Sequence, residues 1–154
     1  MSFAGYLGDF MQKIVLPEKL PENVDLLFPF DDPEVKTVVK RFYQKYYHDN
    51  QPRLMLFGIN PGRFGAGVTG IPFTDPLQLT SSCEIENTFP KKPELSSTFD
   101  YEMIHAYGGP EAFYGDVLLT AIFPLGFTRA GKNLNYYDDP MLQKTLEPSI
   151  IKCI

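Results

Sequence analysis

The sequence feature that most constrains the fold is an apolar run, residues 54–59, followed at once by a glycine-rich loop, residues 62–70. The length of the run and the polar and proline residues around it indicate a short strand buried on both faces. Helices must then cover both sides of its sheet, so the run predicts an α/β fold. The loop glycines permit positive φ angles or a close approach to a ligand; they are Gly62, Gly65, Gly67 and Gly70. Ligands of open α/β sheets bind at the carboxyl ends of the strands, so this loop is a candidate binding site.

The rest of the chain supplies a second core strand and several amphipathic helices. An apolar run at residues 117–123 ends at Pro124 and predicts that strand. Apolar spacing predicts helices at residues 3–14, at 33–46 after Asp32, at 99–107 with its N-terminus near Ser97, and after Asp139. The segments predicted to be irregular are residues 17–29, 72–97 and 127–137. We therefore expect one domain over residues 1–154, with a helical part at 1–50 and the core at 53–154.

Composition disfavours several classes of protein. The 154 residues are 44% hydrophobic and 21% charged, and no run approaches the roughly 18 apolar residues that a membrane span needs. The N-terminus lacks a signal-peptide pattern, so we expect a cytoplasmic protein without a membrane partner. Cys83 and Cys153 lack the spacing of metal or disulfide motifs, which predicts no metal site. The net charge of −5 disfavours a broad nucleic-acid surface but permits a local basic groove.

Residues 65–70, GAGVTG, match the GxGxxG dinucleotide fingerprint, but their context differs from it. The first glycine of the fingerprint lies in the tight turn that ends a strand, whereas residues 60–64 intervene here. Pro72 and Pro76 prevent the long helix whose N-terminus would hold the pyrophosphate. No GK[ST] follows, so a P-loop is excluded as well. We expect no cofactor.

Read as one unit, the sequence GINPG at residues 58–62, Phe64, and TGIPF at residues 69–73 resemble the first motif of the uracil-DNA glycosylase superfamily. The pattern is most similar to the single-strand-selective monofunctional branch, with GMNPGPFG and TGVPFG, and to bacterial uracil-DNA-glycosylase-like proteins. Pro124 and Leu125 resemble the end of the family's next core strand, so the resemblance covers most of residues 54–146. It implies a three-layer α/β/α fold with a central parallel sheet. It also implies hydrolysis of the N-glycosidic bond of a base flipped out of DNA.

The resemblance assigns roles to individual residues. Asn60 falls where the family positions the attacking water, which an amide can orient without acting as a general base. Phe73 falls where an aromatic ring stacks on the extruded base, an interaction worth about 1–3 kcal/mol. The loop N–H groups would donate to the base carbonyl as its charge grows. The other base-binding candidates are Ile59, Gly62, Phe64 and Ala121. Taken one residue at a time, without the combined motif, the structural interpretations are favoured: an Asx turn for Asn60, a core contact for Phe73 and a tight connection for the glycines.

The chain departs from the family pattern in three respects. Ala121 stands where the family has its base-reading asparagine, and alanine cannot make bidentate hydrogen bonds to uracil. Arg63 stands where the close relatives have proline. The family's His-Pro-Ser motif is absent, and we interpret His48 and His105 as structural helix residues. The candidate DNA contacts are Arg63, Arg129 and Lys132.

These observations predict a uracil-DNA-glycosylase-like N-glycosidase that removes a damaged or deaminated base from single- or double-stranded DNA. The alternative is a non-catalytic nucleotide or single-strand binding module with the same pocket, which Ala121 and the acidic charge favour; a dinucleotide-dependent enzyme is disfavoured. The two predicted strands are fewer than the family's four or so, and the apolar stripe of Ile150, Ile151 and Ile154 ends without a cap. We therefore expect the domain's C-terminal portion to be missing, which leaves an unpaired strand edge that invites self-association.

Overall fold

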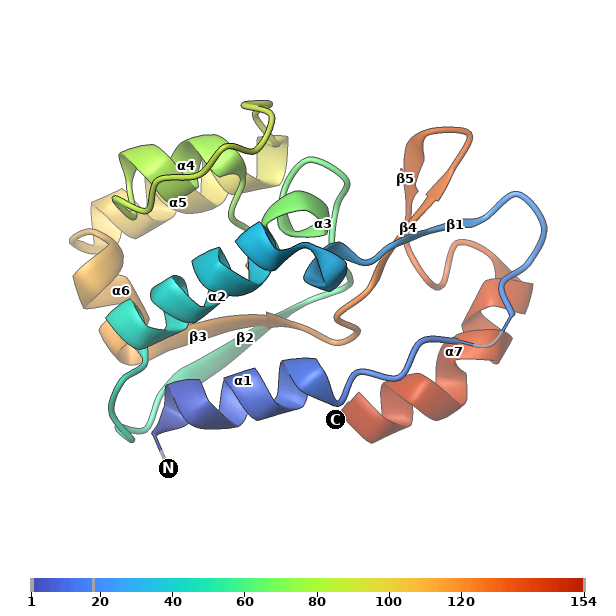
Figure 1. Ribbon diagram of the computed structural model, residues 1–154, viewed down its shortest axis with the longest axis horizontal. Coiled ribbons are helices and arrows are strands. Elements are labelled where there is room, and N and C mark those ends of the chain that lie inside the picture. Colours follow the sequence, from blue (N-terminus) through green and yellow to red (C-terminus); the bar gives the residue numbers. More distant parts are fainter. Residues whose placement is uncertain (1, 18, 154) are drawn as a thin grey trace.

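Two small sheets and the helices around them make up the computed structural model, which describes residues 2–17 and 19–153 (Figure 1). The chain has the predicted mixed α/β composition. Among the described residues, no helix has both the length and the apolar character that crossing a bilayer requires. In chain order the elements are α1 Phe3–Gln12, β1 Asp25–Leu27, the 3-10 turn η1 Pro29–Asp31, α2 Pro33–Tyr46, β2 Leu54–Gly58, α3 Ala66–Thr69, α4 Pro76–Ser81, α5 Leu95–Tyr107, α6 Pro110–Asp116, β3 Val117–Ala121, β4 Gly126–Arg129, β5 Lys132–Leu134 and α7 Pro140–Cys153.

The two strands predicted from apolar runs are present as β2 and β3, and they pair in parallel. Their register sets Gly58 at the end of β2 opposite Ala121 at the end of β3. The two backbones stay together beyond the sheet, because the N–H of Ile122 donates to the carbonyl of Gly58 at 2.9 Å. The loops that follow the two strands therefore start side by side.

The expectation that β2 is buried on both faces is wrong. Leu54 is 65% exposed and Phe57 is 55% exposed, whereas Val117 and Leu118 of β3 are buried. In the part of the chain that the structure describes, β3 is the sole partner of β2, so β2 lies at an edge. An apolar run records a preference for burial, but it does not say which other elements cover the strand.

A second sheet, with strand order β1-β4-β5, is antiparallel, so the described residues form a parallel pair and a separate antiparallel sheet. Parallel pairing is confined to β2 and β3 among the described residues. The segments at residues 17–29 and 127–137, predicted to be irregular, instead contain β1 and the β4–β5 hairpin. The hairpin turns at Ala130 and Gly131, whose φ angles of 49° and 71° suit the two-residue turn that matches strand twist.

Two apolar clusters hold these elements together. One joins α2, α4, α5 and α6 to β3, and the other joins β4 to α7 through Phe127, Leu142 and Leu146. In Figure 1 the helices α4, α5 and α6 lie at the left of the molecule, and α7 lies at the right near the antiparallel sheet. The partly buried Ile14 and Phe28 pack against both clusters, so the two share a boundary.

Helix ends follow the predicted caps at two places and differ at a third. Asp32 caps α2 and Asp139 caps α7, each by accepting hydrogen bonds from first-turn N–H groups. The helix expected near Ser97 is present as α5, but it begins at Leu95, so Ser97 lies inside it and does not cap it. The Ser97 hydroxyl instead accepts a hydrogen bond from the N–H of Asp75 at 3.0 Å, which ties α5 to the segment before α4.

Candidate active site

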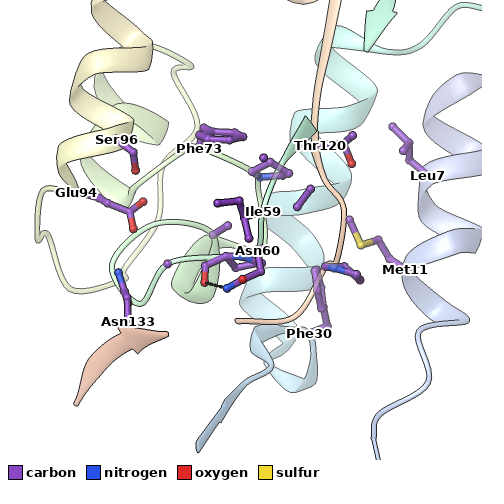
Figure 2. Close-up of a pocket in the computed structure, with 18 of the residues that line it drawn as sticks. Leu7, Met11, Phe30, Ile59, Asn60, Phe73, Glu94, Ser96, Thr120 and Asn133 are labelled. Carbon is purple, nitrogen blue, oxygen red and sulfur yellow. Dashed lines mark hydrogen bonds between the residues drawn. The ribbon is translucent and has the colours of Figure 1, made fainter. Parts of the chain in front are cut away.

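A cavity of about 270 Å³ lies beside the carboxyl ends of β2 and β3 (Figure 2). This volume is close to the lower limit for small-ligand pockets, about 300 Å³. The predicted site residues that line it are Ile59, Asn60, Gly62, Phe73 and Ala121. Polar side chains that line it without having been predicted are Glu94, Ser96, Thr120, Asn133 and Asn135. Segments that are distant in the sequence thus meet around a space of small-ligand size.

Phe73 lies in the cavity wall with a backbone conformation that few residues adopt. Its φ of 56° is in the left-handed region, at a cost of order 1–3 kcal/mol for a residue with a side chain. The fully buried Thr69 holds this turn, because its hydroxyl donates to the carbonyl of Thr74 at 2.7 Å and accepts from the N–H of Ile71 at 3.1 Å. The half-buried ring both packs against the core and lines the cavity.

The Asn60 side chain links the end of β2 to the segment that follows β5. Its Nδ2 donates to the carbonyl of Leu134 at 3.3 Å, and its Oδ1 accepts from the N–H of Tyr136 at 3.1 Å. A longer contact of 3.4 Å joins Nδ2 to the carbonyl of Pro61 (Figure 2). The first two partners are 74 and 76 positions away, so the amide makes a long-range link in place of a purely local turn. A carbonyl oxygen has two acceptor positions, so Oδ1 keeps one for another donor.

Asp75 and Glu94 form a feature of the site that sequence reasoning missed. Asp75 is 1% exposed, and its Oδ1 accepts hydrogen bonds from two N–H groups at the start of α4. Its Oδ2 accepts from the N–H of Glu94 at 2.9 Å, which fixes where α5 begins. The Glu94 carboxyl carbon would lie 3.2 Å from a Cβ on Gly62 and 2.8 Å from one on Gly65, and its oxygens would lie closer still. Glycine at these positions therefore makes room for the carboxyl group.

Two carboxyl groups in this region, Glu94 in the cavity wall and Asp100 on α5, have raised pKa values. Burial is the largest cause of the raised pKa of Glu94, and the Asp75 carboxylate adds to it. Hydrogen bonds from Ser96 and from the N–H of Gly65 act in the opposite direction. On α5, burial raises the pKa of Asp100 to about 6. An acid with a shifted pKa in a cavity wall, such as Glu94, is common in functional sites.

Phe64 and Arg63 were expected at the site but do not line the cavity. The guanidinium of Arg63 lies 4.3 Å from the ring centre of Phe64, and the amine of Lys92 lies 5.4 Å from the same centre. Both distances allow cation–π attraction. The position of Phe64 outside the cavity argues against the predicted contact with the base, and it marks Lys92 as a cation that the sequence pattern did not single out.

The other predicted cations also lie outside the cavity. Arg129 forms an ion pair with Asp139, and its hydrogen bond is the largest cause of the lowered pKa of Asp139. Lys132 is exposed and lies opposite Arg129 in the β4–β5 hairpin. His105 shares a 2.9 Å hydrogen bond with the hydroxyl of Ser82 and does not line the cavity. Among these residues, Lys132 keeps its charge most accessible.

Comparison with known proteins identifies the family. No protein-family model and no curated protein matches the chain. Among solved structures, the crystal structure of wild-type SMUG2 from Pedobacter heparinus, a member of the uracil-DNA glycosylase superfamily, is 43% identical with a TM-score of 0.92. The match covers 99% of this chain and 68% of that chain. An identity this high over nearly the whole chain, together with the motif at residues 58–73, means that the protein belongs to the uracil-DNA glycosylase superfamily.

Proposed function

We propose that this chain is a DNA-repair glycosylase that hydrolyses the N-glycosidic bond of a damaged or deaminated base. The observation that carries the proposal is the meeting of Asn60 and Phe73 in one cavity at the ends of two parallel strands. Enzymes that act on a base take it out of the stack into a pocket, where aromatic side chains hold it. Membership of the superfamily supports this class of reaction.

In this proposal Phe73 stacks on the extruded base and contributes about 1–3 kcal/mol. The hydrogen bonds of Thr69 hold the ring's backbone in place before the base arrives, which reduces the ordering cost of binding. Ile59 and Ala121 add apolar contact from the ends of the two strands. The Ala121 methyl group cannot read a base edge, so it supports no special preference for uracil.

Asn60 orients the attacking water in this proposal through the acceptor position that Oδ1 keeps free. The bonds of its amide to Leu134 and Tyr136 fix the direction in which that position points. Fewer loop N–H groups than expected can donate to the base, because those of Gly67 and Gly70 already bond to carbonyls inside the loop. The N–H of Gly65 already donates to Glu94. Among the loop glycines, Gly62 therefore remains the main candidate donor to the base.

We propose that Arg63, Lys92 and Lys132 contact the phosphate backbone around the mouth of the cavity. Arg63 and Lys92 share the ring of Phe64, so both charges belong to one small area next to the loop. A local cluster of this kind is compatible with the net charge of −5, because phosphate contacts act over a Debye length of about 8–10 Å. Arg129 is a weaker candidate because Asp139 neutralises it.

The test is to incubate the protein with single-stranded oligonucleotides that carry uracil, hypoxanthine or an oxidised pyrimidine, and to measure abasic sites. The expected result is strand cleavage after alkali for at least one damaged base and none for the undamaged sequence. Phe73→Ala serves as the negative control, because it removes the stacking surface. Absence of abasic sites with every substrate would reject the proposed activity.

A non-catalytic binding module with the same cavity is the second candidate function. Ala121 favours it, since the position of the base-reading amide carries a methyl group. Under this alternative the protein binds an abasic-site analogue or a free base, Phe73→Ala weakens that binding, and no bond is cleaved. Binding without cleavage in the assay above would support the module over the enzyme.

We also propose that residues 1–154 form one domain of the uracil-DNA-glycosylase type, in which β2 and β3 belong to the parallel sheet of a three-layer arrangement. The contacts of Ile14 and Phe28 with both apolar clusters support a single cooperative unit. A single unfolding transition, with the calorimetric and van't Hoff enthalpies equal, is the expected result. Two separate transitions would contradict it.

A further inference from the structure

Glu94 occupies a position that its residue type does not favour. It is the N-cap residue of α5, where serine, threonine, aspartate and asparagine stabilise a helix by side-chain hydrogen bonds. The Glu94 side chain makes no such bond and instead lies against the loop that contains Gly62 and Gly65. Where a residue breaks a local rule and lines a cavity, the break points to a role at the site.

The surrounding structure holds this carboxyl group in place from two sides. The buried Asp75 anchors the backbone of Glu94 through its N–H, and α5 continues from there. On the other side, the loop leaves the space beside Gly62 and Gly65 to the carboxyl group. Figure 2 shows the Glu94 side chain on the same side of the cavity as Ser96 and Phe73. Glu94 is thus positioned by contacts independent of any ligand.

Hydrolysis of a glycosidic bond requires an acceptor for a proton of the attacking water. Asn60 cannot fill this role, because an amide is not a base at neutral pH and both of its polar atoms already bond to the backbone. Tyr43 also lines the cavity, but burial raises the pKa of its phenol, which keeps it protonated. Among the described side chains that line the cavity, Glu94 is the one carboxylate.

We propose that, in the glycosylase reaction proposed above, the carboxylate of Glu94 is the general base that accepts a proton from the attacking water. The water oxygen forms a bond to C1′ of the deoxyribose as the bond from C1′ to the base nitrogen breaks. The electron pair of that bond leaves with the base, and the water proton passes to a Glu94 oxygen. The base leaves as its anion and takes up a proton from solvent, Glu94 releases its proton to solvent, and the products are the free base and an abasic site. This inference rests on the proposed function.

The electrostatic surroundings raise the pKa of Glu94 above the ordinary value for a carboxyl group. The carboxylates that face Glu94 are Asp75, from the segment before α4, and Asp100, from α5, and both add to the effect of burial in raising its pKa. Ser96 and the Gly65 N–H stabilise its ionised form and so limit that rise. A catalytic base is most effective when its pKa approaches the working pH.

The test compares Glu94→Gln with the wild type in single-turnover excision from single-stranded DNA between pH 4.5 and pH 8. The amide keeps the shape of the side chain but cannot accept the proton, so we expect a rate about 10²–10⁴-fold lower at pH 7 with unchanged DNA affinity. The wild-type rate should rise with pH through the pKa of Glu94 and then level off, and the variant should lose that rise. Glu94→Asp, which keeps a carboxylate, should retain the rise at a lower rate.

The matched control is Glu86→Gln, which makes the same chemical change at an exposed position outside the cavity. It should leave rate, pH profile and affinity unchanged. If Glu94→Gln excises as fast as the wild type, or keeps the pH profile, Glu94 is not the base while the proposed function stands. Equal losses of DNA affinity and rate would assign Glu94 to binding and also overturn the proposal. If the wild type excises no base, the proposed function and this inference fail together.

Discussion

The ring tip of Phe73 occupies the space that a Cβ on Gly58 would take. A Cβ built on Gly58 would lie 2.9 Å from one ring carbon of Phe73 and closer still to another. The last residue of β2 is therefore a glycine for a steric reason, and the ring rests directly on the end of the strand. Because Gly58 also pairs with Ala121, this one contact connects Phe73 to both parallel strands.

This relationship predicts a strong coupling between the two positions. Gly58→Ala should push the ring from its place, cost about 1–3 kcal/mol as overpacking and lower the melting temperature by about 2–4 °C per kcal/mol. In a Phe73→Ala background the added methyl group has room, so its cost should vanish. Thermal unfolding of both single variants and the double variant measures the coupling. Additive effects would mean that the ring does not depend on Gly58.

Removing the Asn60 amide should reduce turnover more than DNA affinity, because a group that places water acts mainly in the transition state. Asn60→Ala also leaves the carbonyl of Leu134 and the N–H of Tyr136 without their hydrogen-bond partner, which should cost about 1–3 kcal/mol of stability. Single-turnover rates, fluorescence anisotropy and melting curves separate these effects. Asn50→Ala, at an exposed position, is the control. Losses of rate and affinity by the same factor would count against the water-placing role.

Stability should depend on pH through Asp100. Its pKa of about 6 in the folded chain lies above the ordinary value of 3.8, so the folded state holds more protons between these two values. The stabilisation that the protonated Asp100 contributes is therefore complete below about pH 4 and is lost as the pH rises through 6. Asp100→Asn should remove this decrease and match the wild type only at low pH. Melting temperatures from pH 4 to pH 7, with Glu86→Gln as control, test it; parallel curves for Asp100→Asn and wild type would refute the shift.

Salt dependence should identify the cations that contact phosphate. Each lost contact to single-stranded DNA reduces the slope of log affinity against log salt by about 0.7. We expect this reduction for Arg63→Gln, Lys92→Gln and Lys132→Gln, and a smaller one for Arg129→Gln because its charge is paired. Lys144→Gln on α7 is the control. An unchanged slope in the first three variants would place the DNA elsewhere on the molecule.

The exposed apolar side chains of β2 should make the chain associate with itself. Leu54 and Phe57 are more than half exposed on a strand whose outer edge has no partner among the described residues. Light scattering should show an apparent mass that grows with concentration, and Phe57→Lys should abolish the growth. Leu95→Lys removes an apolar side chain that is 92% exposed on α5, and it should have no effect. A wild-type mass of 17.5 kDa at every concentration would contradict the prediction.

Local sequence signals located several elements well. The periodic apolar residues of α2, and the aspartates that cap α2 and α7, act through contacts within a few positions, so the sequence was sufficient to find them. The two apolar runs became strands for the same reason. The β4–β5 hairpin was missed, because its turn is Ala130-Gly131 and lacks the Asn-Gly or Asp-Gly pair that marks two-residue turns in a sequence.

The sequence by itself determined α1, α2, α5 and α7, the two strands with apolar runs, and the motif at residues 58–73, because each depends on residues that are close together in the chain. Tertiary structure alone decided that β2 lies at an edge and that Asn60 bonds to a segment more than 70 positions away. It also decided that the carboxyl group of Glu94 packs against the glycine loop. These features depend on which distant segments meet. Such contacts are set by the packing of the whole chain, and no local pattern of residue types encodes them.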